Sequence, residues 1–249
     1  MRDNDPQELK KKLEYFKNRI EQFPEDGFLW LEYGDFLHYE YNNHEMGVYA
    51  YEQANRLLKD KDMRVRLVNA YSWAGQLEKA VDIFEKSLRE QPLPYVFCRL
   101  AEMYERHDKY DEAIQACHKA LEIDPTYEEA YYFLGESTRR QSRTEAIGYY
   151  REAIKWEPDY QEAWASLGRE LGSDESTRDE AIDALEKALE LDLEDGWSHI
   201  FLAVTLWKKD EIERADYHYQ KAVELLSEEC PDVRRWYQEF LDSTQKDED

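Results

Sequence analysis

Small and bulky residues recur along this chain in a fixed order between polar positions. In each copy a small residue is followed four positions later by a bulky residue, and three positions after that by a second small residue. The copies begin about every 33 to 35 residues, at Gly47, Ala80, Ala113, Ala146, Ala181 and Ala215. Such a period is typical of a solenoid of stacked repeats rather than a fold around one core.

A second pattern precedes the copies and predicts another helix; the second copy departs from it at Arg64 and Val68. Phe97, Leu100, Ala101 and Tyr104 have the spacings of three, four and seven that place residues on one face of an α-helix. The small member of the set lets the two helices of a period approach closely. Three copies end on a proline, which stops the second helix because it cannot donate the intrahelical hydrogen bond. The equivalent first-helix sets begin at Trp30, Tyr131, Trp164 and His199, and the prolines are Pro92, Pro125 and Pro158.

These residues resemble the tetratricopeptide repeat, whose 34-residue period and order of Trp, Leu, Gly, Tyr, Ala, Phe, Ala and Pro they follow. The resemblance covers six copies between residues 27 and 228. It implies an all-α, right-handed superhelical solenoid of six helix-turn-helix repeats. The expected repeats are 27–60, 61–93, 94–127, 128–160, 161–195 and 196–228.

Amphipathic segments flank the repeats at both ends. Residues 1–26 contain Leu9, Leu13 and Phe16 at helical spacing, and residues 229–249 contain Trp236 and Phe240. We interpret the first segment as an N-terminal capping helix and the second as a C-terminal capping helix with a tail. Caps with one polar face keep a solenoid soluble. The prediction is one continuous solenoid domain.

The charge balance limits the partners that the chain is expected to have. The sequence holds 57 acidic and 33 basic residues, for a formal net charge of −24. This surface repels the phosphates of nucleic acids, so we expect no direct nucleic-acid binding. No apolar run approaches the length of a membrane span, and the N-terminus lacks a signal segment. We therefore expect a cytoplasmic protein with no membrane partner and, because both ends carry caps, a monomer.

The sequence contains little that predicts chemistry. Cys98, Cys117 and Cys230 are odd in number and widely spaced, which favours neither a disulfide framework nor a zinc site. Cys98 is expected to face the groove described below. No HExxH motif, phosphate-binding glycine loop or nucleophile elbow is present. Because repeats and caps account for nearly the whole chain, we expect no enzyme, no catalytic residues, no cofactor and no metal.

In tetratricopeptide arrays the first helices line a concave groove that binds peptides or domains of partner proteins, so the resemblance implies a function carried by this surface. The middle of the expected groove is basic, and guanidinium groups suit carboxylates or phosphates of a ligand. The last repeat is aromatic, as surfaces that bind proteins often are; the competing interpretation is that Trp236 or Phe240 covers it. The expected partner-binding residues are Arg66, Asn69, Trp73, Tyr95, Arg99, Arg106, Tyr132, Arg139, Arg140, Arg169, Trp197, Phe201 and Trp207.

Intrahelical ion pairs are the alternative explanation for the arginines. Glu102 precedes Arg106, and Glu136 precedes Arg140, by four positions, the favoured order for pairing on a helix. Such pairs stabilise a helix by a few tenths of a kcal/mol and need no ligand. Sequence alone leaves ligand binding and internal pairing equally open.

Two hypotheses of function follow. The first is a non-enzymatic scaffold or adaptor that holds a peptide or helix of another protein in its groove. The second is an acidic inhibitor or chaperone that masks a basic partner, including one that binds nucleic acids. The carboxylate clamp of chaperone-binding family members is absent, because Val65, Arg99 and Glu129 stand where its Lys and Asn residues are expected.

Overall fold

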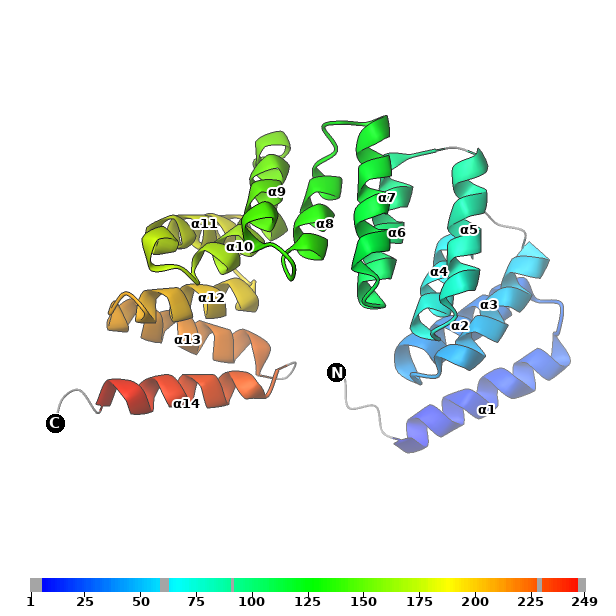
Figure 1. Cartoon of the computed structure of the whole chain (residues 1–249). Coiled ribbons are helices and arrows are strands. Elements are labelled where there is room, and N and C mark those ends of the chain that lie inside the picture. Colours follow the sequence, from blue (N-terminus) through cyan, green and yellow to red (C-terminus); the bar gives the residue numbers. More distant parts are fainter. Residues whose placement is uncertain (1–5, 59–62, 91, 228–229, 246–249) are drawn as a thin grey trace. The chain divides into compact units, whose positions relative to one another are not determined.

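The computed structural model describes residues 6–58, 63–90, 92–227 and 230–245, and all regular elements in these ranges are helices (Figure 1). The outermost parts of the two predicted caps, residues 1–5 and 246–249, lie outside them. The chain divides into two compact units, residues 2–96 and 97–249. The predicted all-α fold of adjacent helix pairs is confirmed.

The unit of residues 2–96 begins with the predicted capping helix. Phe16 of α1 packs against Tyr33 and Phe36, with ring centroids 5.4 Å apart in both contacts. Leu9, Leu13 and Ile20 join the same cluster, so the apolar face of α1 closes the first repeat. The elements are α1 (Pro6–Gln22), α2 (Gly27–Asp35), the π-helical turn η1 (Phe36–Glu40), α3 (His44–Leu58), α4 (Met63–Trp73) and α5 (Leu77–Glu90).

The unit of residues 97–249 contains further helix pairs, each joined by a short turn. Helices α8 and α9, α10 and α11, and α12 and α13 pack as neighbours, and α14 packs on α13. The elements are α6 (Pro94–Arg106), whose first turn holds the boundary between the units, α7 (Tyr110–Ile123), α8 (Glu128–Thr138), α9 (Arg143–Trp156), α10 (Gln161–Leu171), the 3₁₀ turn η2 (Glu175–Thr177), α11 (Arg178–Leu191), α12 (Gly196–Trp207), α13 (Ile212–Leu226) and α14 (Asp232–Gln245).

Close helix packing at the small positions is confirmed. A Cβ atom added to Gly34 would lie 2.7 Å from the ring of Tyr51, and one added to Gly135 would lie 2.3 Å from the ring of Tyr150. Real Cβ atoms do not approach other atoms this closely, so each tyrosine occupies the space that the glycine leaves. The bulky residue of the second helix therefore packs directly on the backbone of the first.

The predicted C-terminal cap covers the last repeat. Phe240 of α14 is buried and lies 4.9 Å from Tyr219 of α13, measured between ring centroids. Val233 of α14 is buried with Ala222 and Leu226 of α13. Helix α14 thus contributes to the core and is not an appendage.

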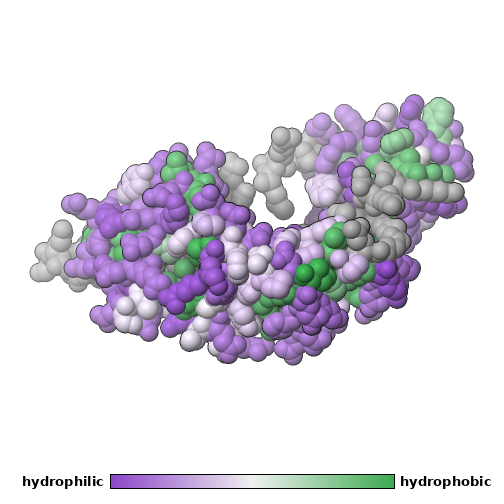
Figure 2. All heavy atoms as spheres, turned by 90° about the horizontal axis from the view of Figure 1, so that it is seen from above, coloured by the Kyte–Doolittle hydropathy of each residue, from purple (hydrophilic) through white to green (hydrophobic). Residues whose placement is uncertain are grey.

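Hydrophilic residues cover most of the face seen in Figure 2, and hydrophobic residues form separate patches between them. This distribution agrees with a net charge of −24. Among the described residues, no helix has the length and apolar character that crossing a membrane requires.

Candidate functional site

Most of the predicted groove arginines bind carboxylates of this chain, namely Arg66, Arg99, Arg106, Arg139 and Arg169. Arg66 of α4 forms an ion pair with Asp35 of α2, the preceding first helix. The hydroxyl of Tyr51 on α3 donates to the same carboxylate at 2.8 Å. Asp35 thus joins three helices of the unit of residues 2–96.

Arg99 and Arg106 of α6 are bound in a similar way. Arg99 donates to Glu102 at 2.5 Å, forms an ion pair with Glu129 of α8, and lies over the ring of Phe133 at 5.5 Å from its centroid. Arg106 also pairs with Glu102, so the Glu102–Arg106 pair expected from the spacing is present. Arg99 therefore links two consecutive first helices.

Glu136 of α8 is the centre of the most extensive network. Its carboxylate accepts hydrogen bonds from Tyr150 of α9 at 2.8 Å, Ser166 of α10 at 2.9 Å and Arg169 of α10 at 2.8 Å. Arg139 donates to the other oxygen at 3.0 Å. Burial alone would raise the pKa of Glu136, but the Arg169 charge and these hydrogen bonds hold it below its ordinary value. The carboxylate is thus kept ionised.

The expected pairing of Glu136 with Arg140 is not the arrangement found. Glu136 receives Arg139 and Arg169 instead, while the guanidinium of Arg140 lies over the ring of Tyr110, 5.1 Å from its centroid. Arg169 of the next repeat therefore binds the carboxylate that the intrahelical spacing suggested for Arg140. Internal pairing explains much of the basic zone, and a role of these arginines in binding stays a prediction.

The remaining predicted residues of the groove divide between the two units. In the unit of residues 2–96, Asn69 is half-buried, Tyr95 is exposed, and Trp73 is exposed with its ring 5.6 Å from that of His44. In the other unit, Tyr132 is half-buried against Tyr160 at a centroid distance of 5.3 Å. Each of these residues therefore lies within its own unit, and their joint role in binding stays a prediction.

The predicted aromatic zone of the last repeat borders a cavity of about 420 Å³. Trp197, Phe201 and Trp207 of α12 line it together with Trp236 of α14. Trp197 keeps 44% of its surface exposed, while Trp207 packs edge-on against Phe240 at 5.6 Å. Helix α14 therefore covers part of the aromatic zone and supplies one wall of a pocket beside it.

Charged side chains stand around this pocket. Arg169, Lys208 and Glu239 belong to its lining, and Arg169 also lies over the ring of Phe201, 5.9 Å from its centroid. Arg169 belongs at once to the Glu136 network and to the pocket wall. The competing interpretation, that Trp236 or Phe240 covers part of the aromatic zone, agrees with this arrangement. The place of Glu239 in the lining was not predicted, because it depends on how α14 docks.

The described residues offer no metal site and no reactive thiol in the groove. No group of three or more His, Cys, Asp or Glu side chains among them is placed to hold a metal ion. Cys98, expected to face the groove, is fully buried, which corrects that expectation. Burial raises the pKa of the Cys98 and Cys117 thiols, so both stay protonated.

A buried and a half-buried histidine form a pair in the last repeat. The Nδ1 atoms of His199 on α12 and His218 on α13 are 2.8 Å apart, so one ring donates and the other accepts. Burial, the neighbouring His199 and Arg214 lower the pKa of His218 to about 4. Both rings are therefore neutral at physiological pH, and the pair serves to join the two helices.

Comparisons with known proteins identify the repeat and the fold. The tetratricopeptide repeat family matches residues 94–127. The yeast Tom70 structure is 16% identical at a TM-score of 0.71, over 96% of this chain and 60% of that chain. The structure of the APC/C hetero-tetramer Cut9-Hcn1 is 17% identical at a TM-score of 0.65, and the match covers 95% of this chain and 49% of that chain. TTC0263, a thermophilic tetratricopeptide protein of Thermus thermophilus, is 22% identical at a TM-score of 0.59, and the match covers 73% of this chain and 99% of that chain. The chain thus carries a tetratricopeptide repeat and has the fold of tetratricopeptide proteins.

Proposed function

We propose that this tetratricopeptide-repeat chain is a non-enzymatic scaffold that binds a peptide or helix of another protein, with the α12–α14 pocket as its anchor point. Proteins of this fold are generally protein–protein interaction modules. The observation that carries the proposal is the pocket of about 420 Å³ beside exposed Trp197 and half-buried Phe201. Aromatic side chains in a pocket are the usual anchors of protein interfaces.

The anchor suits an apolar or aromatic side chain of the partner. Trp197, Phe201 and Trp236 offer ring surface to it, and desolvation of such surface on both partners supplies the gain in free energy. Lys208 lies on the rim and is exposed, so it favours an acidic residue next to the anchor. The groove arginines add less, because a ligand must first displace their carboxylate partners.

A matched pair of tryptophan variants tests this proposal. Trp197 of α12 is 44% exposed and lines the pocket, whereas Trp156 of α9 is 42% exposed and does not. We expect Trp197→Ala to weaken capture of partner proteins at least tenfold, as for an interface anchor worth about 2 kcal/mol, and Trp156→Ala to leave it unchanged. The readout is quantitative mass spectrometry after affinity capture with the full chain, followed by titration of the captured partner. Equal loss in both variants, or no loss in Trp197→Ala, contradicts the proposal.

The net charge of −24 supports a second candidate, an inhibitor or chaperone that masks a basic partner through its acidic faces. A complex held in this way weakens steeply as ionic strength rises, because exposed charges are screened. We expect a Trp197→Ala variant to retain such a partner. A complex that survives high salt and depends on Trp197 favours the pocket over the acidic surface.

A further inference from the structure

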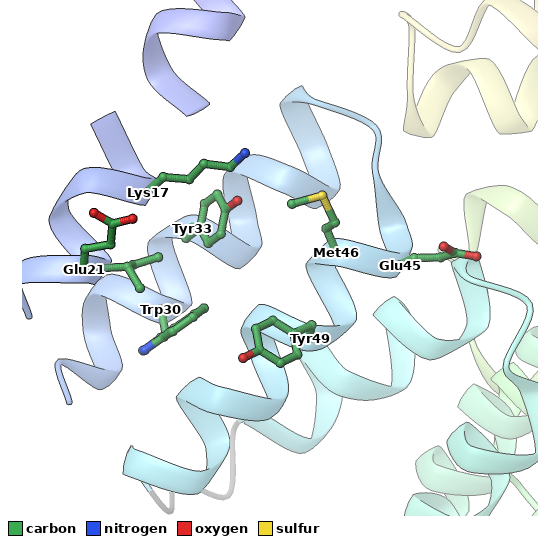
Figure 3. Close-up of a pocket in the computed structure, with 8 residues that line it drawn as sticks. Lys17, Glu21, Trp30, Tyr33, Glu45, Met46 and Tyr49 are labelled. Carbon is green, nitrogen blue, oxygen red and sulfur yellow. The ribbon is translucent and has the colours of Figure 1, made fainter. Parts of the chain in front are cut away.

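A second cavity, of about 440 Å³, lies within the unit of residues 2–96 between the capping helix and the first repeat. Three aromatic rings form its walls: Trp30 and Tyr33 from α2 and Tyr49 from α3 (Figure 3). Ile20 of α1 and Met46 of α3 complete the apolar part of the lining. No residue of the predicted groove belongs to this cavity.

The rings are held at steep angles to one another. Trp30 and Tyr49 have centroids 5.7 Å apart and planes inclined at 80°, and Trp30 and Tyr33 are 6.3 Å apart at 52°. The indole nitrogen of Trp30 donates to the carbonyl of Pro24 at 2.8 Å, and Tyr33 is buried in the core of the first repeat. Two of the three walls are therefore fixed before any ligand arrives.

Ring faces carry the negative part of the aromatic quadrupole, so a corner of three rings attracts a cation. Glu21 and Glu45 also belong to the lining, on opposite sides of the rings in Figure 3, and the Glu45 carboxylate points away from the rings. Lys17 of α1 also lines the cavity and is the one positive charge among the lining residues. With a net charge of −24 on the whole chain, the surroundings favour a positive ligand.

We propose that this cavity binds a trimethylated lysine side chain of a partner protein. An unmethylated ammonium has three N–H donors that need acceptors, whereas a trimethylammonium has none and tolerates apolar walls. A planar guanidinium stacks best on a single flat face, and rings inclined at 80° suit a group with the tetrahedral shape of trimethylammonium better. The cavity is in the other unit from the α12–α14 pocket, so the two proposals fail independently.

The probe is a short glycine–serine peptide with one trimethyllysine, titrated into the full chain by calorimetry at low ionic strength. The comparison peptides carry unmethylated lysine, or a neutral isostere in which a tert-butyl group replaces the trimethylammonium. We expect the trimethyllysine peptide to bind about fivefold more tightly than the neutral isostere, because the two differ in charge and hardly in shape. Equal binding of the two peptides, or no binding of trimethyllysine at millimolar concentration, overturns the proposal.

Substitutions at Tyr49 separate ring electrostatics from simple apolar contact. Tyr49 is 55% exposed, so its replacement spares the core, and Tyr217 of α13, also 55% exposed, serves as a matched control outside the cavity. We expect Tyr49→Phe to retain the affinity for trimethyllysine, Tyr49→Leu to lower it about fivefold, and Tyr217→Leu to change nothing. Full affinity in Tyr49→Leu contradicts a cation held by rings.

The sign of the ligand charge is tested at Lys17. Lys17→Gln removes the positive charge from the lining, so affinity for the trimethyllysine peptide should rise about twofold or more at low ionic strength and less at high. Weaker binding in Lys17→Gln would mean that the cavity takes an anionic group. Choline, titrated separately, should bind more weakly than the peptide. If it binds as tightly, the cavity takes a free small cation, and the proposal of a trimethylated lysine from a partner protein is wrong.

Discussion

Replacing Gly135 with alanine should destabilise the chain, although alanine is the better helix former. The added Cβ would lie 2.3 Å from Cε1 and 2.7 Å from Cδ1 of Tyr150. Tyr150 is fully buried, so its ring has no free space in which to turn. The ring must move with its helix, and α8 and α9 must separate locally.

The expected magnitude follows from the contacts of Tyr150. Overpacking a core position costs about 1–3 kcal/mol. The displaced hydroxyl also weakens its hydrogen bond of 2.8 Å to the Glu136 carboxylate, a bond of a kind worth about 1.5–3 kcal/mol. Removing a helical glycine returns only about 0.5–1 kcal/mol. We therefore expect Gly135→Ala to lower the free energy of unfolding by about 2–4 kcal/mol.

Gly148 provides a control on the neighbouring helix α9. No atom lies within 4 Å of a Cβ added there, so Gly148→Ala should raise the free energy of unfolding by about 0.5–1 kcal/mol. Urea unfolding followed by circular dichroism at 25 °C measures both variants against the parent chain. If Gly135→Ala is as stable as the parent, or if both variants lose stability alike, close packing of Tyr150 on Gly135 is not what this position requires.

Three further outcomes are expected. Burial and the nearby carboxylates raise the pKa of Glu105 to about 7, so this group adds stability as the pH falls from about 7 towards 4.5, the pKa of the group in the unfolded chain. Glu105→Gln should remove this pH dependence. At pH 8 it should raise the free energy of unfolding, measured in urea, by about 1–3 kcal/mol over the parent. The imidazole of His218 should titrate near pH 4 by NMR, and because it is neutral beside His199 in the fold, its contribution to stability is lost as the pH falls from 6.5 to 4. A thiol reagent should label half-exposed Cys230 in the native chain and reach buried Cys98 only after unfolding; equal rates contradict the packing.

The helix pairs could be predicted from the sequence because their packing demands particular residues at particular positions. Gly34 and Gly135 stand where the bulky Tyr51 and Tyr150 need space, and Gly168 leaves the same space for Leu185. The need is steric and local, so it leaves a direct record in the spacing of small and large residues. The apolar face of α1 could also be predicted, because its residues recur at helical spacing in the sequence.

The candidate site was less accessible to sequence reasoning. Intrahelical spacing offered Arg140 as one possible partner of Glu136, but Arg169 of the next first helix binds that carboxylate. Which arginine pairs with Glu136 depends on the distance between stacked helices, and the repeat period does not specify that distance. Both pockets also need a capping helix in a definite position: Trp236 of α14 closes one, and Ile20 of α1 closes the other. The sequence indicates the apolar faces of these helices and not the space that they leave.

The Glu136 network also distinguishes one neighbouring repeat from another. Repeats of similar sequence have similar apolar faces, which would allow a folding chain to dock the wrong pair together. Glu136 finds Tyr150 within its own repeat but requires Ser166 and Arg169 from α10. A repeat without an arginine at that position leaves the Glu136 carboxylate with Arg139 as its counter-charge and without the hydrogen bond and charge of Arg169. The Glu136 contacts favour one neighbouring repeat over another, so we expect an exchange of repeats within the chain to destabilise this junction first.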